Sequence, residues 1–169
     1  MGVDPGLAAT GFGVLECGPG RVLVRASGVV HAAAGLALDA RLETIHAAVR
    51  EVIARHVPAL VAVEDLYAEY RFPRQAILMG HARGVIYLAA RQLGVPVVAI
   101  APAEVKRAVT GNGAAGKAQV QRAVQTLLGL PRPPQPSHVA DALGLAVTGL
   151  VRITGRLPGA GSPVRRAAP

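Results

Sequence analysis

Tryptophan is absent from this 169-residue sequence, cysteine occurs once, and aromatic residues make up only 3% of it. The single Cys17 excludes both a disulfide framework and a CxxC metal site. No apolar run approaches the roughly 18–20 residues that a membrane span requires. The start, MGVDPG, lacks the basic and apolar regions of a signal peptide. We therefore expect one soluble, cytoplasmic globular domain with its own core.

Acidic residues are scarce in the last part of the chain. Residues 105–169 contain nine Lys or Arg side chains against one acid, Asp141, whereas residues 1–104 contain nine of each sign. The net charge of +8 thus comes entirely from the C-terminal part. This asymmetry favours a polyanionic partner, most simply nucleic acid. A solubilising basic surface followed by a basic tail is the alternative explanation.

The order of the predicted elements indicates an α/β fold. Apolar runs and periodicity predict strands at GVD, 10–16, 21–30, 59–65 and within VPVVAIAP, and helices at Leu38–His56, 74–93, about 103–110, 117–129 and from Ser137 onward. The first three strands form a meander, and the helix that follows carries the chain to a strand parallel to the first. The prediction is a mixed five-stranded sheet with helices on both faces. Residues 1–152 would form this domain, and residues 153–169 a basic Gly/Pro/Arg-rich tail without fixed structure.

Acidic side chains end two strands that we predict to be neighbours. Asp4 ends the first strand and Glu64 ends the strand beside it, at a strand spacing of ~4.8 Å. His138 and Asp141 lie three residues apart at the start of the last helix, so they share one helix face. Crowded carboxylates repel one another unless a cation neutralises them. Oxygen ligands with an imidazole suit Mg²⁺ or Mn²⁺, and two such ions would activate a water against a phosphodiester.

Each of these residues also has a simpler explanation. Asp4 before Pro5 could initiate a turn, and Glu64 could belong to a salt bridge. His138 and Asp141 could occupy the first helical turn, with Asp141 complementing the helix dipole. We favour the metal site because three separate segments bring acids or histidine to the same sheet end.

Four segments resemble the RuvC family of Holliday-junction resolvases in order and spacing. They are GVDPGLAATGFGVLE, VAVEDLY, VKRAVTGNGAAGK and HVADALGLA, and the resemblance covers about residues 2–152. It implies an RNase H-like fold and a bacterial, homodimeric, divalent-metal nuclease that resolves four-way DNA junctions in recombination and repair. We expect symmetric paired nicks with 5′-phosphate and 3′-hydroxyl ends. Cooperation with the RuvA/RuvB branch-migration machinery is also implied.

The resemblance also assigns roles to individual residues. By match to the family motifs, Asp4, Glu64 and Asp141 would be metal-binding carboxylates. His138 falls where many members carry another Asp and some carry His, so it is a fourth metal ligand or a general base; we favour the ligand. Only three residues precede Asp4, so the first strand looks short compared with the family. We expect either that the numbering begins at a late start codon or that upstream residues are missing.

Candidate DNA contacts lie in two loops. Lys106 and Lys117, the only two lysines, flank the Gly-rich loop TGNGAAG, whose amides could approach phosphates, although a flexible turn explains the glycines equally well. In RuvC-like proteins the matching lysines lie along the DNA path. The loop DLYAEYRFPR adds Tyr67, Tyr70, Arg71 and Arg74. An exposed aromatic side chain can stack on an unpaired base, and in the family the Tyr67 position is typically an aromatic that enters the junction. Alternatively, Tyr67 packs the loop down.

The helix over 74–93 has little polar surface, which predicts a second partner besides the sheet. We expect this partner to be a second subunit, because two symmetric nicks suit a C₂ dimer. A deeply buried helix in a monomer is the alternative. The predicted interface residues are Ile77, Leu78, Gly80, His81 and Gly84.

Other functions remain open at this stage. VDPGLAATGFGV also resembles the phosphate-binding hairpin of actin-like and sugar-kinase ATPases, which need a second domain that 169 residues cannot supply. A RuvX/YqgF-like nuclease acting on RNA and a junction-binding module without catalysis are the remaining alternatives.

Overall fold

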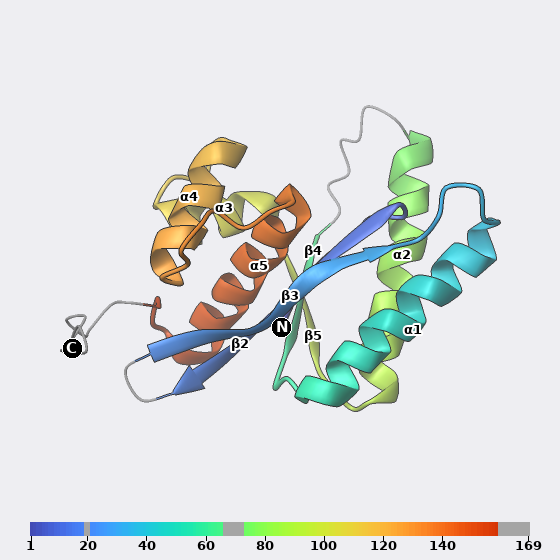
Figure 1. Cartoon of the computed structure of the whole chain (residues 1–169), viewed down its shortest axis with the longest axis horizontal. Helices are drawn as coiled ribbons and strands as arrows, with labels where there is room; N and C mark the ends of the chain where they lie inside the picture. Colours follow the sequence, from blue (N-terminus) through green and yellow to red (C-terminus); the bar gives the residue numbers. More distant parts are fainter. Residues whose placement is uncertain (19–20, 66–72, 159–169) are drawn as a thin grey trace.

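The computed structural model describes residues 1–18, 21–65 and 73–158 (Figure 1). In chain order the elements are β1 (Gly2–Asp4), β2 (Ala9–Gly18), β3 (Arg21–His31), α1 (Leu38–His56), β4 (Val61–Glu64), α2 (Pro73–Gln92), β5 (Val97–Ile100), α3 (Pro102–Thr110), α4 (Lys117–Leu127) and α5 (Ser137–Thr154). The helix predicted from Leu38 to His56 has the same bounds in the structure, and β2 is longer than the predicted 10–16.

The five strands form one mixed sheet in the order β3-β2-β1-β4-β5. β1 pairs antiparallel with β2 and parallel with β4, and β4 pairs parallel with β5. This is the meander followed by parallel strands that the sequence predicts, so the predicted fold class is confirmed.

Helices cover both faces of the sheet, α1 and α2 on one side and α3, α4 and α5 on the other (Figure 1). Strand alternation separates the two cores. Val3 and Val63, paired between β1 and β4, are buried in one cluster with Ile45 of α1 and Ile86 of α2. Ala62, the residue before Val63, faces the other side of the sheet, where it packs in one cluster with Leu145 of α5.

Glycines on the strands let α5 approach the sheet closely. A Cβ on Gly2 would lie 2.1 Å from the carbonyl oxygen of Ala142, and one on Gly11 would lie 2.1 Å from that of His138. Any side chain at these positions would push the first turns of α5 off the sheet. Gly11 pairs with Asp4 across β1 and β2, so the glycine beside Asp4 is what admits the start of α5.

Two further expectations concern the whole chain. Within the described residues, no helix is long and apolar enough to cross a membrane. α5 continues to Thr154, two residues past the predicted end of the domain at 152, and residues 159–169 of the predicted tail lie outside the described part.

Candidate functional site

A cavity of about 680 Å³ opens at the carboxyl ends of β1 and β4. Its lining includes the three acids and the histidine predicted from the sequence, together with both lysines: Asp4, Glu64, Asp141, His138, Lys106 and Lys117. The structure thus brings together residues from five elements that span most of the chain. The predicted convergence on one sheet end is observed.

Strand register places the first two carboxylates side by side. Val3 pairs with Val63 in the parallel β1–β4 ladder, so the next residues, Asp4 and Glu64, end neighbouring strands at the same edge. Because Val3 and Val63 face α1 and α2, alternation directs Asp4 and Glu64 toward the opposite face, where α5 lies.

The first turns of α5 supply the other two side chains. α5 begins at Ser137, and residues three and seven positions after His138, namely Asp141 and Leu145, line the cavity with it. This spacing puts all three on one helix face. The close approach at Gly2 and Gly11 therefore lowers His138 and Asp141 onto the strand ends.

One hydrogen bond joins this group directly. The Nδ1 atom of His138 lies 2.7 Å from Oδ2 of Asp4, whose side chain is 10% exposed against 42% for His138. Burial raises the pKa of Asp4, the hydrogen bond from His138 opposes this rise, and the nearby charge of Asp141 adds to it. An imidazole that donates through Nδ1 to the carboxylate stabilises the ionised Asp4.

The remaining carboxyls lie in an unfavourable environment for charge. Burial, with repulsion from Asp4 and Asp141, raises the pKa of Glu64 to about 7. Burial also raises the pKa of Asp141, while Lys117, His138 and Lys106 oppose the rise. Three acids whose ionised forms are all penalised are a set that a bound cation would stabilise.

The donor set fits a hard divalent ion, but the side chains are not gathered into a finished ligand cluster. Oxygen atoms from three carboxyls with one imidazole match the preferences of Mg²⁺ and Mn²⁺. Across residues 1–18, 21–65 and 73–158, no group of three or more His, Cys, Asp or Glu side chains is arranged so that it could hold a metal ion. The chemistry of the residues and their charge penalty support the predicted metal site, and direct ligation remains a prediction.

Lysines flank the acids from α3 and α4. Lys106 lies in the middle of α3 and Lys117 is the first residue of α4. Lys117 lowers the pKa of Asp4, Glu64 and Asp141 through its charge, so its ammonium lies within electrostatic range of the whole acidic group. The loop between the two helices turns at Gly111, whose φ of 77° favours glycine.

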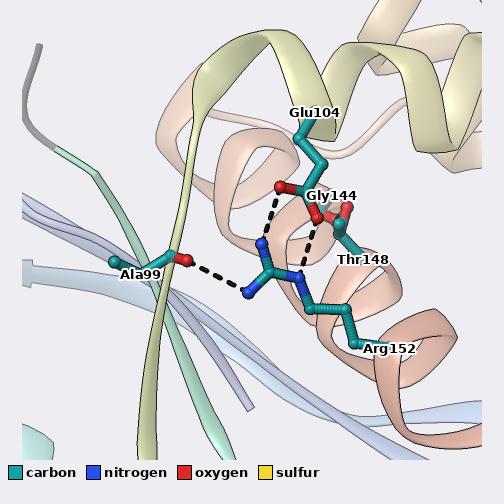
Figure 2. Close-up of polar contacts among 5 residues, drawn as sticks. All are labelled: Ala99, Glu104, Gly144, Thr148 and Arg152. Carbon is teal, nitrogen blue, oxygen red and sulfur yellow. Dashed lines mark hydrogen bonds and ion pairs between the residues drawn. The ribbon is translucent and has the colours of Figure 1, made fainter.

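Two contacts fix α3, and with it Lys106, against α5. Arg152 donates through Nε to Oε1 of Glu104 at 2.8 Å and through Nη2 to Oε2 at 2.7 Å (Figure 2). Its Nη1 donates to the carbonyl oxygen of Ala99 on the edge strand β5 at 3.2 Å. One residue on from Glu104, Val105 packs 3.1 Å from where a Cβ on Gly144 would lie, so α3 sits directly on α5.

The other predicted contacts fare differently. Tyr67, Tyr70 and Arg71 lie outside the described residues, so the structure places none of them. Arg74 is exposed on α2. Of the predicted dimer residues, Ile77 is 61% exposed, His81 and Gly84 are exposed, Gly80 is half-buried, and Leu78 is half-buried and lines the cavity. An exposed isoleucine on α2 is compatible with the predicted interface, which stays a prediction.

Sequence reasoning missed one charged residue of the cavity. Arg41 of α1 lines it from the opposite face of the sheet to Lys106 and Lys117. Its position in the sequence, in the first turn of an amphipathic helix, resembles that of any solvent-facing arginine. No local signal could have distinguished it.

Comparison with known proteins assigns the chain to a family. The family model "Crossover junction endodeoxyribonuclease RuvC" matches residues 1–149. The chain belongs to the RuvC family.

Individual RuvC proteins are similar over most of their length. The crossover junction endodeoxyribonuclease RuvC of Rhodopirellula baltica is 46% identical over 149 residues, which cover 88% of this chain and 84% of that one. The solved Thermus thermophilus RuvC structure superimposes with a TM-score of 0.83 at 38% identity, covering 93% of this chain and 96% of that one. The T. thermophilus RuvC structure in complex with Holliday junction substrate gives a TM-score of 0.84 at 38% identity, covering 90% and 92%.

Proposed function

We propose that this chain resolves four-way DNA junctions by symmetric paired nicks, during homologous recombination and DNA repair. Membership of a family of crossover junction endodeoxyribonucleases makes it a nuclease that acts on DNA. The observation that carries the proposal is the cavity in which three carboxyl groups with raised pKa values and a histidine lie with two lysines. An acidic site flanked by cations suits a nuclease, because the acids hold metal and the lysines hold phosphate.

Nucleases of this family generally need a divalent metal ion. We propose Mg²⁺ or Mn²⁺, two ions per site, held by Asp4, Glu64 and Asp141 together with His138. When bound, the metal would lower the pKa of a water molecule and neutralise charge that develops on the phosphate. By holding the metal, the carboxyl groups of Asp4, Glu64 and Asp141 would position that water for attack on the scissile phosphate, with cleavage of the P–O3′ bond. Attack on phosphorus then leaves a 5′-phosphate and a 3′-hydroxyl end.

His138 has two candidate roles, and its hydrogen bond to Asp4 bears on both. As a ligand, the imidazole would join the carboxylates on the ion. As a general base, it would take the proton of the attacking water, with the Asp4 carboxylate holding the ring in place through Nδ1. We favour the ligand role, because many RuvC proteins carry Asp at this position and an aspartate is a poor base near neutral pH.

DNA binding would extend from the cavity over the basic surface. Lys106 and Lys117 contact phosphates next to the scissile bond, and Tyr67, Tyr70, Arg71 and Arg74 contact the junction near its centre. Two protomers pair through α2 to present two such sites, as two symmetric nicks require. We further propose that residues 1–152 form the nuclease domain, that residues 153–169 add a basic tail, and that the protein acts in the bacterial cytoplasm with RuvA and RuvB.

Cleavage of a synthetic mobile four-way junction tests the proposal directly. The junction, the matching linear DNA duplex and an RNA duplex are each incubated with protein in Mg²⁺, Mn²⁺ or EDTA. We expect paired nicks in the junction, restored by either metal and abolished by EDTA. Equal cutting of linear DNA without metal contradicts the proposal, preferential cutting of RNA favours the RNA nuclease, and binding without cleavage favours a junction-binding module.

A matched pair of variants ties the chemistry to the cavity. Asp141→Asn removes one carboxylate of the site, and Glu43→Gln removes one exposed carboxylate on α1. We expect the first variant to lose cleavage by orders of magnitude while it still binds the junction, and the second to cleave as the parent does. Full activity in Asp141→Asn would remove α5 from the proposed metal site.

A further inference from the structure

Arg41 lines the cavity, and the described residues offer its side chain no acceptor. The Nε atom of Arg83 is likewise buried without a partner, although Arg83 pairs with Asp65 through Nη2. Arg152 pairs with Glu104, and Arg55 with Glu51. For Arg41, the structure of the described residues records no ion pair and no side-chain hydrogen bond, and its Nε atom is buried without any partner. A guanidinium carries five N–H donors and stays charged at every physiological pH.

A buried donor without an acceptor is costly, and more so when it belongs to a charged group. The cost is smaller where water reaches the rest of the group, and a ligand that supplies an acceptor gains by pairing with it. Arg41 lines the open cavity that holds Asp4 and Glu64, so such a ligand could reach it there.

The position of Arg41 complements that of the two lysines. Lys106 and Lys117 reach the cavity from α3 and α4, which cover one face of the sheet, and Arg41 reaches it from α1 on the other face (Figure 1). The acids at the strand ends line the same cavity as both groups of cations. The chain has only these two lysines, so a DNA strand that extended toward α1 would meet no lysine there.

Part of the cavity wall is apolar. Leu7 from the turn after β1, and Leu78 and Met79 from α2, line the cavity with Arg41. Water competes less for a phosphate beside such a wall than on an open surface, which strengthens a charge-assisted hydrogen bond. The planar fork of a guanidinium also matches two oxygens of one phosphate.

We propose that Arg41 binds a backbone phosphate of the junction strand, on the far side of the scissile bond from Lys106 and Lys117. This inference rests on the proposed junction-resolving function. Arg41 acts as a binding residue, so it lowers the dissociation constant of the DNA complex and takes no part in proton transfer or in metal binding.

Junction binding by the full chain in EDTA, measured across a series of KCl concentrations, tests the proposal. The variants are Arg41→Gln, which removes the charge, and Arg41→Lys, which keeps it. Arg50→Gln is the matched control, because Arg50 is an exposed arginine on the same helix and does not line the cavity. Thermal unfolding of each variant checks that the fold is intact.

For Arg41→Gln we expect about tenfold weaker binding at low salt, as for loss of a charged hydrogen bond. The slope of log K against log salt should fall by ~0.9, as for loss of one phosphate contact. Arg41→Lys should retain the slope, and Arg50→Gln should retain both affinity and slope. In Mg²⁺, single-turnover cleavage by Arg41→Gln should recover the parental rate at saturating protein.

Three results would overturn the assignment. An unchanged salt slope in Arg41→Gln, with the parent binding and cleaving normally, shows that the guanidinium meets no phosphate. A lower unfolding temperature with unchanged DNA affinity shows that the residue is structural, and a lower maximal rate with unchanged affinity shows that it acts in the chemistry. Failure of the parent itself to bind or cut junctions would instead refute the proposed function.

Discussion

The crowded carboxyl groups of the cavity predict that replacing one of them, Glu64, by a neutral residue stabilises the protein when metal is absent. Burial and the charges of Asp4 and Asp141 raise the pKa of Glu64 from 4.5 to about 7. Each pKa unit corresponds to about 1.4 kcal/mol, so ionised Glu64 costs the fold about 3 kcal/mol at pH 8. Glu64→Gln removes this cost and keeps the shape of the side chain.

The pH dependence has a definite sign. Because the folded pKa lies above the unfolded one, the stability linked to Glu64 is fully present below pH 4.5 and is lost as the pH rises through about 7. At pH 8 in EDTA, Glu64→Gln should therefore unfold at a temperature roughly 6–12 °C above that of the parent, at ~2–4 °C per kcal/mol for a domain of this size. At pH 5 only a small part of this difference should remain.

Calorimetry or circular dichroism at the two pH values measures the effect, with Glu43→Gln as the control. Glu43 is exposed on α1, so its variant should match the parent at both pH values. Adding Mn²⁺ or Mg²⁺ should raise the unfolding temperature of the parent more than that of Glu64→Gln, because a bound cation stabilises the full set of carboxylates. A variant that is less stable than the parent at pH 8 in EDTA, or equally shifted at pH 5, would refute this reasoning.

Three other predictions follow from the same geometry. Lys106→Ala should weaken junction binding and lower the salt slope by ~0.9, and an unchanged slope in a binding titration would remove Lys106 from the DNA path. Arg152→Ala removes the contact that holds α3 and should lower junction affinity a few-fold and stability by about 0–1 kcal/mol. The control Arg25→Ala breaks an exposed ion pair on the β2–β3 hairpin and should lower stability alone. Equal junction affinities in the two variants would show that Arg152 does not position Lys106. His138→Asp should retain cleavage with a preference shifted from Mn²⁺ toward Mg²⁺. Loss of the acidic limb of the pH–rate profile in this variant, with unchanged metal preference, would make His138 a general base.

The sequence predicts the part of the site that depends on strand ends and helix periodicity. Asp4 and Glu64 each follow a short apolar run, and the chain order makes those runs neighbours, so their meeting follows from topology. His138 and Asp141 share a face because any helix spaces residues that way. None of these placements requires knowledge of side-chain packing, which is why they could be derived.

The rest depends on how closely the elements approach one another. Arg152 and Glu104 are 48 residues apart, and they pair where α3 packs on α5, with Val105 close to Gly144. The distance from α5 to the sheet likewise depends on Gly2 and Gly11, since a Cβ there would meet backbone atoms at 2.1 Å. In the sequence, these glycines cannot be told apart from glycines in turns.

The same reasoning explains why Arg41 could not be predicted and why it matters to the site. Whether an arginine in the first turn of α1 faces water or the cavity depends on how α1 packs on the sheet, where Ile45 and Val49 are buried in the core. The positions of Lys106 and Lys117 could be predicted from a sequence motif, whereas the position of Arg41 on the other face depends on this packing. If Arg41 binds a phosphate as proposed, the packing of α1 contributes to substrate binding, as the proposed contacts of Lys106 and Lys117 do on the other face.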